Sequence, residues 1–268
     1  MKTDLICPIC RAPLAFSART YVCLDGHSYD RAREGYVNLL LNQRRGVHGD
    51  NREMILARRD FLDRGYYAAL AERLASALEG QLGGEAHLLD AGCGEGYYTE
   101  AVAKRLDRAH ILGIDISKEA LRLAGKRLPN AEFAVGSLYA LPVADETQDA
   151  LVCLFAPLVA EEFHRALKPN GIFAMAVPGA RHLFGLKRVL YDSPYENPQK
   201  DTALEGFILE DEYAVDGSAV IESSADIQAL FAMTPYYYRT PAEGRARLAA
   251  LDRLETEISF RMLIYRRV

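Results

Sequence analysis

The middle of the chain alternates short apolar runs with segments of helical periodicity. The first apolar run reads HLLDA at residues 87–91, and it is followed by AHILGIDIS, AEFAVGSL, DALVCLFAP and KPNGIFAMAVP. Helices are expected between these runs at about 97–106 and 160–167. Alternation of this kind predicts a doubly wound parallel sheet. Ligands of such sheets bind at the carboxyl ends of the strands, so we expect the functional site at that edge.

Periodic patterns also flank this region. From residue 52 to residue 80 an apolar residue recurs every four positions, which predicts one amphipathic helix. Near the end, SADIQALFAMTP is typical of a helix, and a second helix is expected to end near residue 254. The final segment EISFRMLIYRR alternates and predicts an antiparallel strand at the edge of a mixed sheet. The stripe of the first helix is Leu62, Tyr66, Leu70, Leu74 and Leu78, and the apolar face of the last strand is Ile258, Phe260, Met262 and Ile264.

A glycine-rich turn follows the first apolar run. Gly92, Gly94 and Gly96 form a G-x-G-x-G pattern, and Tyr97 stands where the dinucleotide-binding fingerprint has its third glycine. A turn of this kind lets a ligand approach the backbone closely. Asp115 ends the next apolar run, roughly 20 residues after the turn, where a carboxylate holds the two hydroxyls of a bound ribose.

Further candidate ligand contacts lie at the same edge of the predicted sheet. Asp90 directly precedes the turn and can hold backbone donors or the ammonium group of a ligand. The third apolar run ends near Ser137 and Leu138, and the fourth ends at residues 155–157.

The first thirty residues carry a metal-binding pattern. Cys7 and Cys10 are separated by two residues, and Cys23 and His27 by three. Two close pairs of sulfur and imidazole ligands suit a tetrahedral Zn²⁺ site, which would supply much of the folding free energy of so small a module. A redox Cys-x-x-Cys would need a strand-to-helix setting, which Pro13 and the surrounding turns do not favour. The segment LAFSARTYVC between the pairs predicts a hairpin.

The segment after His27 mixes arginines with aromatic and amide side chains. Such residues can stack on and neutralise single-stranded nucleic acid, or they can form a solvated linker with a few tyrosines packed on the main domain. Both interpretations stay open. The residues are Tyr29, Arg31, Arg33, Tyr36, Asn38, Gln43, Arg44, Arg45 and His48.

Composition limits the broad class. The chain has 268 residues and a net charge of −5, which argues against a generally basic nucleic-acid-binding surface, although residues 1–60 carry ten basic against seven acidic side chains. The odd number of cysteines, five, argues against an exported protein held together by disulfides. No apolar run reaches the ~20 residues of a membrane span. We therefore expect a cytoplasmic protein without a membrane partner. The expected division is a zinc module at 1–35, a linker at 36–60 and a catalytic domain at 61–268.

The block LLDAGCGEGYYT, GIDIS and KPNGIFAMAVP resembles motifs of class I S-adenosylmethionine-dependent methyltransferases over residues 85–268. With CPIC…C…H, REGYVNLL, ARRDFLDRGYY and PGARHL added, nearly the whole chain resembles the 23S rRNA (guanine-N1)-methyltransferases of the RlmA type. The resemblance implies a Rossmann-like doubly wound sheet, an N-terminal zinc module that grips an rRNA hairpin, and methylation of N1 of one of two neighbouring guanines near the peptide exit tunnel. One subgroup of the family is linked to tylosin-type macrolide resistance, and GDNREM resembles that subgroup.

The resemblance also implies roles for individual residues. Gly94 and Glu95 fall on the cofactor turn, and Tyr67 and His182 match positions that contact S-adenosylmethionine. From the pattern alone, Tyr67 is also a core tyrosine and His182 a residue at a helix start. The four metal positions are those already named from their spacing. A homodimer is plausible, because one small module offers little surface for RNA.

The reaction also requires a group that accepts the proton of guanine N1. Methyl transfer from a sulfonium is an in-line displacement that depends on alignment, and guanine N1 must lose its proton to attack. We expect a carboxylate or a backbone carbonyl near residues 155–158 to receive that proton. The reachable side chains are Glu95, Glu161 and Glu162, each of which could equally be an ordinary turn or helix-start carboxylate. No catalytic residue is assigned. Cys93 and Cys153 are interpreted as small buried apolar residues.

Two other functions use parts of the same pattern. A methyltransferase acting on a quinone or another small metabolite would share every feature after residue 85, but it has no evident need of the zinc module. A nucleic-acid-binding zinc protein without activity would not need the glycine turn with Asp115 at its distance.

Overall fold

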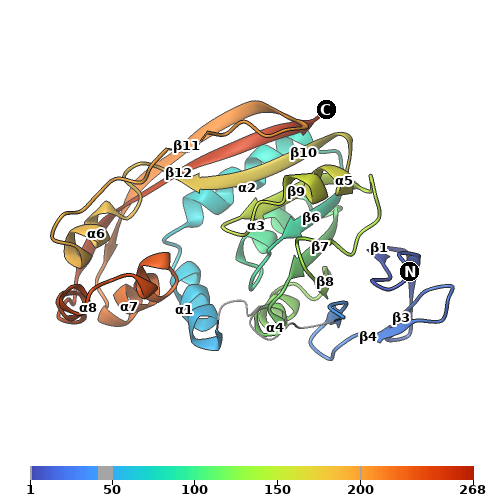
Figure 1. The fold of residues 1–268 in the computed structure, drawn as a ribbon, viewed down its shortest axis with the longest axis horizontal. Helices are drawn as coiled ribbons and strands as arrows, with labels where there is room; N and C mark the ends of the chain where they lie inside the picture. Colours follow the sequence, from blue (N-terminus) through green and yellow to red (C-terminus); the bar gives the residue numbers. More distant parts are fainter. Residues whose placement is uncertain (1, 42–50, 200) are drawn as a thin grey trace.

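The computed structural model describes residues 2–41, 51–199 and 201–268, and their strands form two sheets (Figure 1). The larger sheet has eight strands in the order β11-β12-β10-β9-β6-β7-β8-β5, and the smaller has the order β1-β2-β3-β4. The expected α/β fold with a doubly wound mixed sheet is confirmed. The strands of the larger sheet are β5 Tyr36–Asn38, β6 His87–Ala91, β7 His110–Asp115, β8 Glu132–Val135, β9 Gln148–Leu154, β10 Leu167–Pro178, β11 Phe207–Ile221 and β12 Leu254–Arg267.

Helices cover both faces of the larger sheet. Helices α2 and α3 pack with β6, β9 and β12 in one core cluster, whereas α5 packs in the cluster of the opposite face. The helices are α1 Arg52–Asp63, α2 Ala68–Gln81, α3 Tyr97–Arg105, α4 Lys118–Arg127, α5 Ala160–Ala166, α6 Phe184–Leu190, α7 Ser224–Ala232 and α8 Ala242–Ala249. Among the described residues, no helix is both long enough and apolar enough to cross a bilayer.

The order of the parallel strands creates a switch point at β6. From β6 the chain proceeds to β7 and β8 on one side and then crosses to β9 and β10 on the other, and all these neighbours are parallel. The two directions diverge at β6, which is the switch point where such sheets bind ligands.

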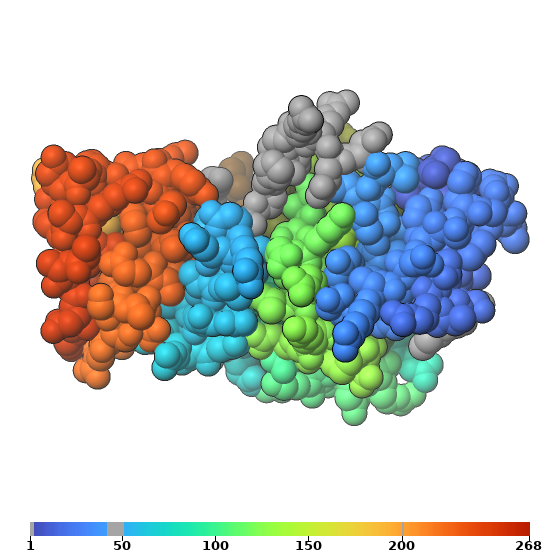
Figure 2. All heavy atoms as spheres, turned by 90° about the horizontal axis from the view of Figure 1, so that it is seen from below, coloured from blue at the N-terminus to red at the C-terminus, as the bar shows by residue number. Residues whose placement is uncertain are grey.

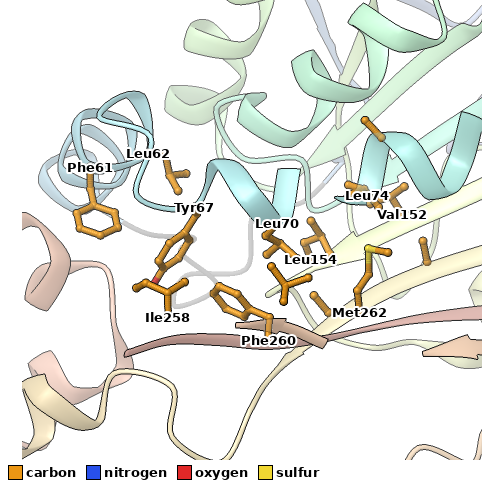
Figure 3. Close-up of a cluster of buried hydrophobic side chains, with 14 of the residues drawn as sticks. Phe61, Leu62, Tyr67, Leu70, Leu74, Val152, Leu154, Ile258, Phe260 and Met262 are labelled. Carbon is orange, nitrogen blue, oxygen red and sulfur yellow. The ribbon is translucent and has the colours of Figure 1, made fainter. Parts of the chain in front are cut away.

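The single helix expected over residues 52–80 is two helices. Gly65 has φ of +83°, in the left-handed region, and its N–H donates to the carbonyl of Leu62 at 2.8 Å, so α1 ends there and α2 starts in a new direction. The break turns Tyr67 into the core, where its ring lies 5.3 Å from that of Phe61 and 5.0 Å from that of Phe260 (Figure 3).

The final strand is antiparallel, as expected, but it does not form the edge of the sheet. β12 lies between β10 and the long strand β11, which the sequence pattern did not reveal. β11 is largely exposed, and a register shift between Leu209 and Asp211 interrupts its alternation. The four apolar residues of β12 do share one face, since Ile258, Phe260, Met262 and Ile264 all lie in the same core cluster.

The N-terminal sheet packs against the larger sheet, since Leu5 and Leu14 share a core cluster with Leu89 and Leu112. Its strands are β1 Lys2–Ile6, β2 Pro13–Ser17, β3 Thr20–Val22 and β4 Ser28–Asp30, with the expected hairpin formed by β2 and β3. Within the segment expected as a linker, β5 pairs in parallel with β8, and the Asn51 side chain caps α1 by accepting from the N–H of Met54 at 2.9 Å. Figure 2 shows the first forty residues at one end of the molecule and the C-terminal helices at the other, with α1 between them.

Tight packing of α6 on β12 yields a stability prediction. A Cβ at Gly185 would lie 2.2 Å from the carbonyl oxygen of Glu255 and 2.8 Å from Cα of Thr256, whereas a Cβ at Gly80 in α2 would meet no described part of the chain within 4 Å. We expect Gly185→Ala to lower the free energy of unfolding by about 1–3 kcal/mol and Gly80→Ala to raise it by up to about 1 kcal/mol. Urea denaturation of both variants measures this, and equal midpoints would contradict the packing described.

Candidate cofactor and metal sites

Three left-handed glycines shape the turn after β6. Gly92, Gly94 and Gly96 have φ of +86°, +56° and +86°, values that L side chains adopt at a cost. A Cβ at Gly92 would lie 2.4 Å from Cβ of Ala156, so no larger residue fits there. A Cβ at Gly94 would meet no atom of the described residues within 4 Å, so none of them covers this stretch of backbone.

Asp115 connects this turn to the end of β7. The N–H of Gly94 donates to Asp115 Oδ2 at 3.0 Å, and the N–H of Ser117 donates to Oδ1 at 2.8 Å. The carboxylate therefore holds the turn against the neighbouring strand. It lies at the edge where a ribose was expected, and that role remains a prediction.

Asp90 is buried beneath the turn. It accepts a hydrogen bond of 2.6 Å from the hydroxyl of Thr99 in α3. Burial, which opposes ionisation, raises the pKa of Asp90 to about 7. The carboxyl group is thus poised between its neutral and its charged form at physiological pH. The sequence pattern singled out Asp90 but gave no signal for Thr99.

Two buried polar atoms near the turn have no protein partner among the described residues. They are Oε1 of Glu95 and the hydroxyl of Tyr98. Oε2 of Glu95 accepts from the N–H of Tyr97 at 3.1 Å, and burial raises the pKa of the Glu95 carboxyl. Buried polar atoms without partners are costly in a folded protein. A polar ligand at the turn would satisfy them, so these residues fit S-adenosylmethionine.

The end of β8 also adjoins the turn. Leu138 is buried, and one of its methyl carbons would lie 3.7 Å from a Cβ at Gly92. The Ser137 hydroxyl accepts from the N–H of Tyr139 at 3.2 Å. Both residues stand at the expected edge of the sheet.

Tyr67 and His182, which are 115 positions apart, meet in the core. His182 Nδ1 accepts from the N–H of Ser259 at 3.2 Å, and its Nε2 lies 3.3 Å from the Tyr67 hydroxyl oxygen. Burial first, with the charge of Lys187 second, lowers the pKa of His182 to about 3, so the ring is neutral. With Nδ1 accepting, the proton sits on Nε2 and is donated to Tyr67. The Tyr67 hydroxyl hydrogen is then available to another acceptor.

Aromatic rings extend from this pair to the surface. The ring of Phe260 lies 4.3 Å from that of His182 and 5.4 Å from that of Phe155, which in turn lies 6.1 Å from Tyr98. Phe155 follows β9 with φ of +59° and leaves 51% of its surface exposed. Strained backbone conformations recur at functional sites, so Phe155 is a candidate for contact with a ligand. Sequence reasoning placed Phe155 at the edge without assigning it a role.

The four expected metal ligands converge in the N-terminal sheet. Their ligand atoms all lie within 4.8 Å of one another, and the cysteines form no disulfide. The sulfur atoms of Cys10 and Cys23 are 3.6 Å apart, and His27 Nδ1 lies 3.6 Å from Cys7 and 3.4 Å from Cys23. Zn–S bonds of about 2.3 Å in a tetrahedron place sulfurs about 3.8 Å apart. The donor set and spacing therefore fit zinc.

Tyr29 supports this cluster from the side. Its hydroxyl lies 3.1 Å from the sulfur of Cys7, an outer contact of the kind that orients metal ligands. Arg31 donates to the carbonyl of Gly35 at 3.0 Å, and Arg33 is exposed. Gln43, Arg44, Arg45 and His48 lie outside the described residues.

The carboxylates considered as proton acceptors differ in their surroundings. Glu162 accepts from the N–H of Leu141 at 2.7 Å and forms an ion pair with Arg165 at 2.9 Å, so its carboxylate is already engaged. Glu161 is exposed at the start of α5. Cys93 and Cys153 are buried, as expected, and burial raises the pKa of both thiols.

Two family models match the chain. One, described as a methyltransferase domain, matches residues 88–171. The other, described as the N-terminal zinc ribbon of RlmA, matches residues 5–46.

Individual relatives give the same result. A Micromonospora griseorubida protein that bears the provisional name 23S rRNA (guanine-N1)-methyltransferase is 36% identical, over 94% of each chain. The 23S rRNA (guanine(748)-N1)-methyltransferase of Streptomyces fradiae is 38% identical over 67% of this chain and 65% of its own. Among solved structures, a provisionally named methyltransferase of Bacillus halodurans C-125 superposes with a TM-score of 0.50 at 16% identity, over 73% of this chain and 97% of that one, which supports the fold alone.

The raised pKa of Asp90 predicts a pH-dependent stability. The folded protein retains a proton on Asp90 that the unfolded chain releases near pH 4, so this carboxyl destabilises the fold increasingly as pH rises through about 7. Asn in its place still accepts the Thr99 hydroxyl but cannot ionise. We expect Asp90→Asn to gain stability relative to the unsubstituted protein between pH 5 and pH 8, by a few kcal/mol.

Thermal denaturation without cofactor at the two pH values measures this. Asp216→Asn, at an exposed position of β11, is the matched control and should show no such trend. A stability difference for Asp90→Asn that is constant with pH would show that Asp90 is ionised throughout.

Proposed function

This chain belongs to the RlmA family of 23S rRNA (guanine-N1)-methyltransferases, and we propose that it transfers a methyl group from S-adenosylmethionine to N1 of a guanine in a hairpin loop of 23S rRNA. Zinc and S-adenosylmethionine are its cofactors. We assign zinc to Cys7, Cys10, Cys23 and His27. We assign the cofactor site to Tyr67, Asp90, Gly92, Gly94, Glu95, Gly96, Asp115, Ser137, Leu138 and His182.

One observation carries the proposal: the Cys₃His cluster and the glycine turn belong to one continuously packed structure. Leu5 of β1 forms a bridge with Val143, and the N–H of Ile6 donates to the carbonyl of Pro142 at 2.9 Å. A methyltransferase of small molecules needs no such module, and a zinc protein without activity needs no such turn.

The cofactor supplies an electrophilic methyl group on a sulfonium, and the protein's task is to align the acceptor and receive its proton. The N1 edge of guanine is paired in a duplex, so the base must come from a loop or be extruded. An extruded base needs an aromatic surface. Phe155 offers one at the carboxyl end of β9, supported by the rings of Tyr98 and Phe260.

Glu95 is the side chain best suited to receive the N1 proton. Its Oε1 atom is buried, lacks a partner among the described residues and lies on the turn itself. Burial raises its pKa, which makes the carboxylate a stronger base than a solvated glutamate. Glu162 is a weaker candidate because Arg165 neutralises it.

Three further parts of the proposal follow from the function. An rRNA substrate implies a cytoplasmic site of action. A homodimer would double the RNA-binding surface of a small module. Tylosin-type resistance would follow if the methylated guanine lies at the macrolide site, and growth of an expressing strain on tylosin tests it.

Removal of zinc should separate the two binding activities. We expect chelation, or Cys23→Ser, to weaken binding of a 23S hairpin by tenfold or more, because the module folds on its metal. The dissociation constant of S-adenosylmethionine should change less than twofold. Fluorescence anisotropy measures the first and calorimetry the second. Restored RNA binding after zinc is returned to the chelated protein is the control, and equal loss of both affinities would make the module a structural brace.

Substitution of Phe155 should lower activity toward the RNA and leave cofactor affinity unchanged. Stacking on a base is worth about 1–3 kcal/mol, so Phe155→Ala should lower kcat/KM for the RNA by about tenfold or more at unchanged cofactor affinity. Phe155→Tyr keeps a stacking ring and should retain most activity, whereas Phe155→Leu keeps bulk without one and should not. Equal activity of the Tyr and Leu variants would argue against stacking.

A further inference from the structure

A second cluster of metal-ligating side chains lies at the opposite edge of the sheet from the glycine turn. Four adjacent parallel strands each begin with a polar residue: Gln148 in β9, His87 in β6, His110 in β7 and Glu132 in β8. Asp4 of β1 lies against this row. The ligand atoms of Asp4, His87 and His110 all lie within 4.8 Å of one another.

Distances within the cluster leave one contact unexplained. Asp4 Oδ2 lies 2.6 Å from His87 Nδ1, an ordinary hydrogen bond, but 3.6 Å from His110 Nδ1. That nitrogen is buried and has no hydrogen-bond partner among the described residues. The other ring nitrogen of His110 lies 3.7 Å from Glu132, whose two carboxylate oxygens share the one hydrogen of the Thr3 hydroxyl, each at 2.8 Å.

These contacts orient His110 in a particular way. At 3.6 Å from Asp4, His110 Nδ1 forms no hydrogen bond in either neutral tautomer of the ring. In the tautomer with its hydrogen on Nε2, the Nδ1 lone pair faces the Asp4 carboxylate, and a cation between these two acceptors would join them. A second proton on His110 is one such cation, and the Asp4 contact raises the pKa of His110. A metal ion is the other.

One of the two distances to Asp4 already suits a metal. Metal–nitrogen and metal–oxygen bonds of about 2.0–2.2 Å in a tetrahedron place ligand atoms about 3.3–3.6 Å apart, which matches the 3.6 Å between Asp4 and His110. The 2.6 Å hydrogen bond between Asp4 and His87 would have to open to this spacing as His87 Nδ1 gives up its hydrogen. Glu132 lies 3.7 Å from the other ring nitrogen of His110, and at hydrogen-bond distance it would support a metal-bound histidine. Gln148 is fully buried, donates from Nε2 to Asp4 at 3.1 Å and leaves Oε1 without a partner among the described residues. Rotation of this amide by 180° would present Oε1 as a fourth ligand.

We propose that Asp4, His87 and His110 form a second site for a divalent transition metal such as Zn²⁺, with Gln148 Oε1 or water completing its coordination. Its ligands join β1 of the N-terminal module to β6 and β7 of the catalytic domain. A bound ion fastens the two parts together at the amino edge of the sheet. This role is separate from the Cys₃His cluster and from methyl transfer.

Cobalt substitution distinguishes the two sites. Co²⁺ at the Cys₃His cluster gives an intense thiolate charge-transfer absorption, whereas Co²⁺ bound by nitrogen and oxygen alone gives only weak visible bands. Metal-free full-length protein titrated with Co²⁺, and separately with Zn²⁺ under elemental analysis, should bind two equivalents, of which only one produces the thiolate absorption.

His87→Gln and His110→Gln should each bind one equivalent while the thiolate absorption stays at full intensity, which also shows that the module is folded. His164→Gln removes a histidine outside both clusters and should still bind two. The proposal is overturned if the unsubstituted protein binds one equivalent in excess zinc, or if both cluster variants keep two.

Discussion

The order of the parallel strands around β6 is the constraint on which both edges of this molecule depend. Because the chain leaves β6 toward β7 and β8 and later returns to β9 on the other side, the strand ends diverge at β6 and the glycine turn opens there. The same order aligns the first residues of the four strands at the other edge. The same strand order therefore places the glycine turn at the carboxyl ends of the strands and a row of polar residues at their amino ends.

Burial acts in one direction on the titratable groups around the glycine turn. It raises the pKa of Asp90 and Glu95, keeps Tyr67 protonated and lowers the pKa of His182. Burial thus disfavours the charged form of each of these groups. A sulfonium cofactor brings the positive charge that favours ionisation of the two acids. If Glu95 is the base, as proposed, binding of the methyl donor would favour its ionised form.

Local patterns in the sequence predicted most of the elements and one of the two clusters. Residues of the glycine turn and of Cys7–His27 lie close together in the chain, so their spacing carries the geometry. Contacts between residues distant in the chain could not be predicted from spacing. Tyr67 contacts His182 because Gly65 ends the first helix, although the apolar spacing continues across that break. β11 was missed because a register shift disrupts its alternation. His87 and His110 are far apart in the sequence and become neighbours only because β6 and β7 pair in parallel.

The short strand β5 has a consequence for how the two parts of the molecule can be separated. It enters directly after the N-terminal sheet and hydrogen-bonds along β8, which would otherwise be the last strand of the larger sheet. A catalytic fragment that begins at residue 61 would expose the unpaired backbone of β8, and exposed strand edges recruit other chains. The segment expected as a linker thus supplies the last strand of the larger sheet, and a cut placed at residue 61 would remove that strand.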